Sequence, residues 1–204
     1  MFTNILDSKQ VALLDLIKYF SKDYYLVGGT AIALQIGHRR SIDFKLFSYK
    51  PIKRQNIKNY LQKNELKYIT LFEDSEQLHI ILKEVKITFF HYPFNVEPSI
   101  KYNDIIKMPG LLTLAAIKAY ALGGKNKWKD YVDLYFLINK YHSFDEISIK
   151  AKEIFGDAFN PKLFKQQLAY FDDINYSESV EYVVPPVDEK TIKDFLTEIA
   201  LAPF

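Results

Sequence analysis

Apolar and polar residues alternate along residues 42–47, a pattern typical of a β-strand that buries only one of its faces. The alternation assigns the side chains to two faces, one with Ile42, Phe44 and Leu46 and the other with Asp43, Lys45 and Phe47. We expect the first face to join a hydrophobic core. The second face then presents a carboxylate and an ammonium group two residues apart.

A glycine turn and a short helix precede this strand. The apolar run at residues 24–27 predicts a strand that ends at Gly28 and Gly29, where glycine lets the backbone turn closely. Thr30 then opens an apolar helix that Gly37 ends. Free N–H groups and a hydroxyl at the start of such a helix are suited to binding a phosphate.

The rest of the pattern predicts further strands and then helices. Residues 7–20 have helical spacing after a cap at Asp7 or Ser8, and the lysine-rich segment 51–64 predicts another helix, with Pro51 in its first turn. Strand-like runs occupy residues 66–72, 77–83 and 85–94, and the last two predict a hairpin. Helical spacing begins near residue 103 and predicts helices at residues 108–122, 127–141, 144–155, 160–171 and 188–201.

This order of elements predicts an α+β (mixed α/β) fold. We expect a mixed-sheet core at residues 1–100 and an α-helical carboxy-terminal region at residues 101–204 that packs on it. The chain has 204 residues, of which 49% are hydrophobic and 16% aromatic, enough for one substantial core.

Composition excludes some classes of protein. The chain has no cysteine, so disulfides and zinc-thiolate sites are excluded. We see no signal peptide and no membrane span, and therefore expect a cytoplasmic protein. A net charge of +2 does not by itself indicate nucleic acid, although lysines cluster at residues 50–63 and 123–129. Either cluster is equally compatible with a solvated helix face.

Asp43 and Lys45 occupy positions with a recognisable chemistry. Two carboxylates two residues apart on one strand face are a usual means of holding a pair of magnesium ions during phosphoryl or nucleotidyl transfer. Here the second position is Lys45. Two unit charges about 4 Å apart interact by about 4 kcal/mol at an effective dielectric constant of about 20, so the ammonium should weaken metal binding badly. The alternative for Asp43 is a simple ion pair with Arg39 or Arg40.

Four segments in fixed order carry a family resemblance. They are Gly28-Gly29-Thr30, the run His38-Arg39-x-Ser41-x-Asp43, Lys118 in LLTLAAIKAYAL, and Asp130 with Asp133 in WKDYVDLYFL. Together they resemble the AbiEii/AbiGii toxin family of nucleotidyltransferases, within the DNA polymerase beta superfamily. The resemblance spans roughly residues 24–137. The departure is Asp43-Phe44-Lys45, where the family pattern has Asp-x-Asp.

The resemblance implies roles for these residues. Asp43 would bind Mg²⁺, and Lys45 marks the position of the expected second acid. The phosphates of a nucleoside triphosphate would contact the residues Gly28, Gly29, Thr30, Arg39, Ser41 and Lys118. Asp130 or Asp133 would orient Lys118, the basic segment or the nucleotide. We interpret His38 and Trp128 as structural residues, and the strand at residues 85–94 offers no third carboxylate.

Each of these residues also has an alternative explanation, a structural role that involves no ligand. Lys118 follows an apolar helix face and is compatible with a surface lysine whose stem packs on the core. Asp130 and Asp133 lie three residues apart, on one side of a helix, and capping or solvation would also explain them. For Gly28 and Gly29, the requirements of a strand turn are compatible with phosphate binding.

Three explanations fit Lys45, and the sequence does not separate them. It is a deliberate substitution that disables a toxic enzyme, a natural loss of catalysis, or an ammonium that replaces the charge of one metal ion. The intact surrounding motif favours the first.

The resemblance implies a toxin of a toxin–antitoxin pair. Such a protein transfers a nucleoside monophosphate from a nucleoside triphosphate to RNA, with a transfer RNA 3′ end as the leading candidate, or to a protein. In this chain Lys45 would impair the reaction. The alternatives are a catalytically silent module that binds nucleotide or RNA, and a small-molecule nucleotidyltransferase that modifies antibiotics.

Overall fold

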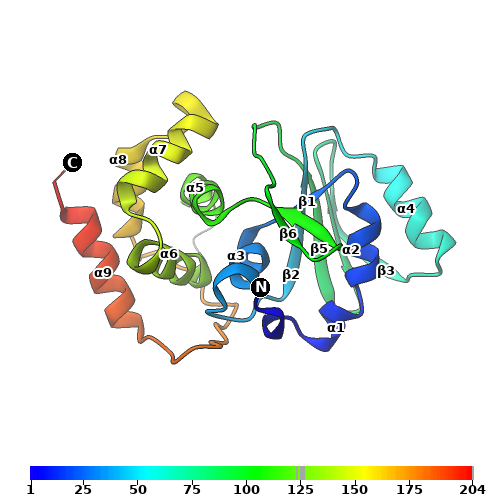
Figure 1. Cartoon of the computed structure of the whole chain (residues 1–204), viewed down its shortest axis with the longest axis horizontal. Helices are drawn as coiled ribbons and strands as arrows, with labels where there is room; N and C mark the ends of the chain where they lie inside the picture. Colours follow the sequence, from blue (N-terminus) through cyan, green and yellow to red (C-terminus); the bar gives the residue numbers. More distant parts are fainter. Residues whose placement is uncertain (123, 125–126, 204) are drawn as a thin grey trace.

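The computed structural model describes residues 1–122, 124 and 127–203, and Figure 1 shows the arrangement of the chain. Its main sheet has five strands in the order β1-β2-β5-β4-β3. The strands are β1 (Tyr25–Val27), β2 (Asp43–Ser48), β3 (Tyr68–Glu73), β4 (Gln77–Leu82) and β5 (Val85–His91). Strands β2 and β5 are parallel and the other neighbours are antiparallel. The predicted mixed sheet, and the hairpin of β4 and β5, are confirmed.

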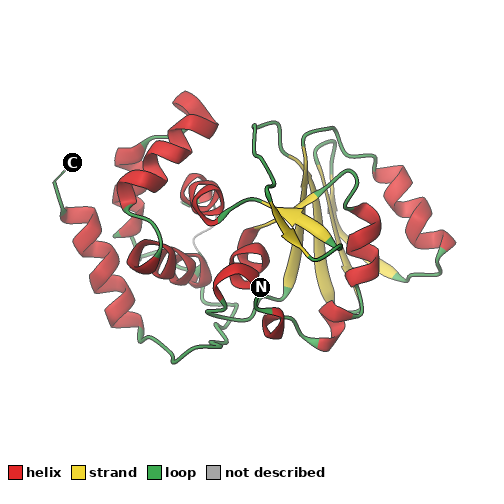
Figure 2. Cartoon of the chain, in the orientation of Figure 1, coloured by secondary structure: helices red, strands yellow, loops and turns green. Residues whose placement is uncertain are grey.

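Helices and a small hairpin complete the fold. In the sheet half, η1 (Thr3–Ile5), α1 (Ser8–Val11), α2 (Leu14–Phe20), α3 (Gly28–Ile36) and α4 (Arg54–Lys63) surround the strands. A two-stranded hairpin follows, formed by β6 (Ile100–Tyr102) and β7 (Ile106–Met108). The second half comprises α5 (Leu111–Ala121), α6 (Trp128–Lys140), α7 (Phe144–Phe155), η2 (Gly156–Ala158), α8 (Pro161–Leu168) and α9 (Glu189–Leu201). The predicted α+β fold class is confirmed, and Figure 2 shows the strands gathered in one half, which also contains helices, while the other half is helical.

Local sequence explains the boundaries that position the site. In β2 the alternation is confirmed, since Phe44 and Leu46 are buried while Asp43, Lys45 and Phe47 are half-buried. Ile42 does not join the core, because it precedes the strand and is 58% exposed. Helix α3 follows β1 without a loop and ends at Gly37, whose positive φ of 66° suits glycine. As a result α3 lies between the sheet and the helices of the second half (Figure 1).

Several predicted boundaries are wrong. Helix α4 begins at Arg54, so Pro51 lies before the helix and not in its first turn. The single helix at residues 7–20 is divided into α1 and α2 around Leu13, although Asp7 caps it as predicted. Helix α3 begins at Gly28 rather than at Thr30. The predicted helical region from residue 103 begins with strand β7, because Asn103 adopts a left-handed turn with a φ of 46° between β6 and β7.

One hydrophobic core extends through both halves. It includes Phe89 of the sheet, Leu34 of α3 and Tyr131 of α6, all of which are fully buried. The division at residue 100 into two regions remains a prediction. Of the predicted lysine cluster at residues 123–129, positions 123, 125 and 126 lie outside the described residues. None of the helices in the described part of the chain has both the length and the apolar character needed to cross a membrane.

Candidate functional site

A cavity of about 300 Å³ lies between the sheet half and the helical half. Its lining includes four predicted site residues, Gly28, Lys45, Lys118 and Asp130. Apolar side chains form the rest of the wall, contributed by Val27, Ile32, Phe47, Leu114, Ile117, Ala121 and Leu122. The structure therefore brings together residues that are up to 103 positions apart, Val27 and Asp130, into one partly apolar pocket with charged groups at its edge.

Lys45 contacts the glycine turn directly. A Cβ atom built on Gly28 would lie 2.8 Å from Cδ of Lys45, and Gly28 has a positive φ of 74°. Only glycine combines this backbone conformation with the space for the lysine stem. Among the residues that the structure describes, Lys45 makes no ion pair. The ammonium of Lys45 is therefore half-buried in the cavity and has no ion-pair partner within the part of the chain that the structure describes.

Gly29 leaves room for the side chains of Arg39 and Ser41 behind the cavity. A Cβ atom on Gly29 would lie 2.6 Å from Nη2 of Arg39 and 3.3 Å from Oγ of Ser41. Thr30 Oγ lies 2.8 Å from Ser41 Oγ and donates to the backbone carbonyl of Asp43. The hydroxyl of Thr30 thus braces β2 and is not free for a phosphate. Gly29, Thr30, Arg39 and Ser41 do not line the cavity.

Asp43 is the described site carboxylate with the fewest contacts. It is half-buried, and its Oδ1 accepts from Ser41 Oγ at 3.5 Å, a long hydrogen bond. On the neighbouring strand β5, Lys86 lies opposite Asp43 and Thr88 lies opposite Lys45. The two β5 residues opposite Asp43 and Lys45 therefore carry no carboxylate.

Asp133 is fully buried and is surrounded by three basic side chains. Arg39 Nε and Nη2 donate to its two oxygens at 2.7 and 2.8 Å, so that the guanidinium holds the carboxylate with both arms. His38 Nε2 lies 2.7 Å and Lys118 Nζ 2.9 Å from the same carboxylate. Lys118 also lies 2.6 Å from Asp130. The two aspartates therefore both orient Lys118, one from the core and one from the cavity edge.

The charges of this cluster follow from its burial and its partners. Burial acts to raise the pKa of Asp133, but Arg39 and Lys118 outweigh it and hold that pKa well below its usual value. Burial acts to lower the pKa of Lys118 and of Arg39, but the aspartates outweigh it and raise both pKa values. For His38 burial dominates and lowers the pKa, despite the hydrogen bond with Asp133. We infer that His38 is neutral and donates from Nε2, with Nδ1 left without a partner.

The carboxy-terminal segment fixes the basic loop in place. Arg40 N donates to the carbonyl of Glu181 at 2.8 Å, and Val183 N donates to the carbonyl of His38 at 3.0 Å. His38 and Arg39 are therefore structural in their observed contacts. Trp128 is buried at the start of α6, which confirms the structural interpretation for this residue.

The side chains do not fit the pair of magnesium ions that the family resemblance implies. Lys45 stands two residues from Asp43 on the same strand face, and Lys86 lies opposite Asp43. Asp133 is already neutralised in the core. Among the described residues, no group of three or more histidine, aspartate or glutamate side chains is placed to hold a metal ion. Magnesium binding by this chain stays a prediction, and we expect it to be weak.

Sequence reasoning did not identify the apolar wall of the cavity. Ile32, Leu114 and Ile117 belong to helices that the sequence predicts correctly, but their periodicity shows only that they are buried. Phe47 carried a usable signal, because the alternation places it on the face of Asp43 and Lys45.

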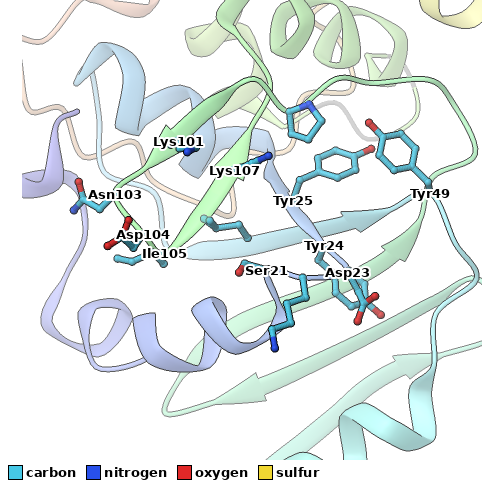
Figure 3. Close-up of a pocket in the computed structure, with 13 residues that line it drawn as sticks. Ser21, Asp23, Tyr24, Tyr25, Tyr49, Lys101, Asn103, Asp104, Ile105 and Lys107 are labelled. Carbon is cyan, nitrogen blue, oxygen red and sulfur yellow. The ribbon is translucent and has the colours of Figure 1, made fainter.

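A second cavity, of about 420 Å³, lies along the edge strand β1 and the β6–β7 hairpin (Figure 3). Tyr25 and Tyr49 lie together at one end of it, with ring centroids 5.2 Å apart, and Lys107 lies beside Tyr25. Asn103 and Asp104 lie at the opposite end. None of the predicted site residues lines this cavity.

Comparisons with known proteins agree with this architecture. The chain is 30% identical over 186 residues to the uncharacterized protein aq_aa25 of Aquifex aeolicus, covering 85% of this chain and 88% of that protein. No family model matches the sequence.

Two solved structures share the fold. The MenT4 nucleotidyltransferase toxin of Mycobacterium tuberculosis aligns with a TM-score of 0.61 and 11% identity, over 95% of this chain and 82% of the toxin. The antibiotic-resistance factor ANT(2″)-Ia aligns with a TM-score of 0.53 and 11% identity, over 72% of this chain and 92% of that protein. At this identity the likeness shows a nucleotidyltransferase-type fold.

Proposed function

The chain belongs to the same family as protein aq_aa25 of Aquifex aeolicus, and we propose that it is a toxin-type nucleotidyltransferase, similar to AbiEii, whose reaction is impaired by Lys45. A single observation carries the proposal. Residues predicted for nucleotide transfer, Gly28, Lys118 and Asp130, meet around one cavity of about 300 Å³ in a nucleotidyltransferase-type fold.

The cavity suits a nucleoside triphosphate. Its apolar wall would contact the base and sugar, and the ammonium group of Lys45 would neutralise phosphate charge. Lys118, already paired with two aspartates, would contribute a hydrogen bond to a phosphate rather than net charge. Lys118 is held at the edge by Asp130 and Asp133, so its position is fixed before the ligand binds. Backbone N–H groups at the start of α3 add donors, since no side chain caps that end.

The transfer reaction is the displacement of pyrophosphate by an acceptor. A nucleophilic oxygen or nitrogen of the acceptor forms a bond to the α-phosphorus, and the bond to the leaving pyrophosphate breaks. We propose RNA as the acceptor, with a transfer RNA 3′ end as the leading candidate and a protein side chain as the alternative to distinguish. The proposed partner is an antitoxin protein, and the proposed location is the cytoplasm, in keeping with the absence of cysteine from the sequence.

Lys45 should have opposite effects on nucleotide binding and on the transfer reaction. An ammonium attracts a triphosphate and repels a metal ion, so the chain should bind the nucleotide and transfer it poorly. The same observation supports the second candidate function, a silent nucleotide-binding module.

The test compares this chain with its Lys45→Asp variant. Each is incubated with labelled nucleoside triphosphates, magnesium and total cellular RNA or protein. We expect labelling only with the variant, because an acid at position 45 restores the pair with Asp43. If neither protein labels an acceptor while both bind triphosphate, the silent module is the correct function. If neither binds triphosphate, both proposals are wrong.

A further inference from the structure

A basic groove with tyrosines runs along the sheet half, outside the nucleotide cavity. It consists of the cavity beside β1 and the hairpin, which we call the hairpin cavity, and a neighbouring cavity of about 200 Å³ beside α2 and α4. The two share Lys22, Asp23 and Tyr24 in their linings. Five lysines line the groove against two aspartates: Lys22, Lys50, Lys53, Lys101 and Lys107, with Asp23 and Asp104. This local excess exceeds the net charge of +2 of the entire chain.

Lys101 and Lys107 are paired in a way that should lower the stability of the hairpin. Lys101 of β6 and Lys107 of β7 are directly opposite each other in the antiparallel hairpin, and both are exposed. Like charges in directly opposed positions destabilise a hairpin. Among the described residues neither lysine makes an ion pair. An anion that binds between them would relieve this repulsion.

Tyrosine rings accompany the lysines. Tyr49 is 44% exposed at one end of the hairpin cavity, and Tyr19 is 52% exposed in the neighbouring one. The hydroxyl of Tyr25 is buried without a hydrogen-bond partner. Cations that follow a backbone together with aromatic faces that receive bases are the combination that binds single-stranded nucleic acid.

The groove ends beside the nucleotide cavity. Tyr25 lines the hairpin cavity, and Val27, two residues further along β1 on the same face, lines the nucleotide cavity. Two residues of a strand span about 7 Å, roughly the spacing between neighbouring nucleotides. Phe47, which is opposite Tyr25 in β2, also lines the nucleotide cavity.

We propose that this groove binds single-stranded nucleic acid and directs one end of it towards the nucleotide cavity. The inference rests on the proposed function in so far as the bound strand is the acceptor. The hairpin lysines hold phosphates and Tyr49 stacks on a base.

The test measures binding of a fluorescein-labelled single-stranded RNA 12-mer by fluorescence anisotropy over a series of salt concentrations. For the double variant Lys101→Gln, Lys107→Gln we expect an affinity about 25-fold lower at about 0.1 M salt and a salt slope shallower by about 1.4. Tyr49→Ala should also weaken binding, by about 5-fold or more. The matched control is Lys63→Gln, Lys162→Gln, which removes two exposed lysines elsewhere and should change little.

A second variant excludes a merely structural effect. Lys101→Glu places a carboxylate opposite Lys107, so it should raise the melting temperature by up to about 4 °C while it lowers the RNA affinity. Loss of folding would change both quantities in the same direction.

Three outcomes overturn the proposal: no RNA binding by the unchanged chain, an equal loss in the control variant, or complete displacement of RNA by an unlabelled nucleoside triphosphate. Triphosphate binding is measured in parallel on every variant. Intact triphosphate binding with unaffected RNA binding refutes the groove alone. Absent triphosphate binding with the expected RNA losses refutes the proposed function and leaves the groove.

Discussion

Asp43 and Asp133 are both predicted site carboxylates, yet their surroundings differ in every respect. Asp133 is fully buried and contacts Arg39, His38 and Lys118. Asp43 is half-buried and makes one long side-chain hydrogen bond. A carboxylate with all its partners inside the protein stabilises the fold, whereas one with few partners is available to a ligand.

The comparison also separates the two lysines of the nucleotide cavity. Lys118 is neutralised by two aspartates, and Lys45 has no partner among the described residues. Lys118 is therefore part of a preformed framework, while Lys45 depends on a ligand for its neutralisation. Substitutions at Asp133 and its partners should mainly lower the free energy of unfolding. Substitutions at Asp43 and Lys45 on strand β2 should mainly change ligand binding.

The largest effect is expected from Asp133→Asn. This change removes the negative charge that Arg39 and Lys118 share in the core. Removing one partner of a buried ion pair lowers the free energy of unfolding by about 3–5 kcal/mol. Urea unfolding measures the loss. Asp130→Asn is the matched control, since Asp130 is a quarter exposed and should cost about 1 kcal/mol or less. Equal losses for the two variants would contradict the comparison.

A smaller effect is expected from Gly29→Ala. The added methyl group would lie 2.6 Å from Nη2 of Arg39 and would displace the guanidinium from Asp133, at a cost of about 1–3 kcal/mol. Gly110→Ala is the control, because its added methyl group would meet no side chain or distant backbone atom within 4 Å. Thermal and urea unfolding compare the two. An unchanged stability for Gly29→Ala would show that Arg39 does not depend on this glycine.

Acid should weaken the same cluster through His38. Its pKa in the folded protein is below the ordinary value of 6.5, so its contribution to stability is complete above pH 6.5. As the pH falls below that value, the unfolded chain binds a proton that the folded chain resists, and stability falls. Melting temperatures between pH 7.5 and 5 should therefore decrease. The His38→Gln variant should show a flatter profile; identical profiles would rule out this titration.

The smallest effect on stability is expected from Asp43→Asn. With one 3.5 Å hydrogen bond to lose, the variant should unfold within about 0.5 kcal/mol of the unchanged chain. The same change in a Lys45→Asp background should abolish any transfer activity that the background gains. A cost in unfolding free energy above about 2 kcal/mol would place Asp43 with Asp133 as a structural residue.

Local pattern was sufficient to predict the strand side of the site. Alternation assigned Asp43 and Lys45 to one face of β2, and Gly37 ended α3 as expected. Both features depend on neighbours within a few residues, which is the range over which periodicity and glycine conformation act.

The Asp133 side could not be predicted in the same way. Arg39 and Asp133 lie 94 positions apart, and nothing in either segment specifies the other as its partner. The nucleotide-binding role of Arg39 stays a prediction, and the structure adds a partner that the sequence did not indicate, the buried carboxylate of Asp133. The β6–β7 hairpin was missed because each strand has three residues, too few for a periodic signal.

The ion pair between Arg39 and Asp133 also orders events during synthesis on the ribosome. Translation completes the glycine turn, β2 and most of the sheet long before α6 emerges with Asp133. Until then the Arg39 guanidinium, which lies against Gly29, lacks Asp133, and Lys118 lacks both of its aspartates. A nascent chain thus has the strand that carries Asp43 but not the framework opposite it. The nucleotide cavity can therefore form only after helices α5 and α6 have been synthesised.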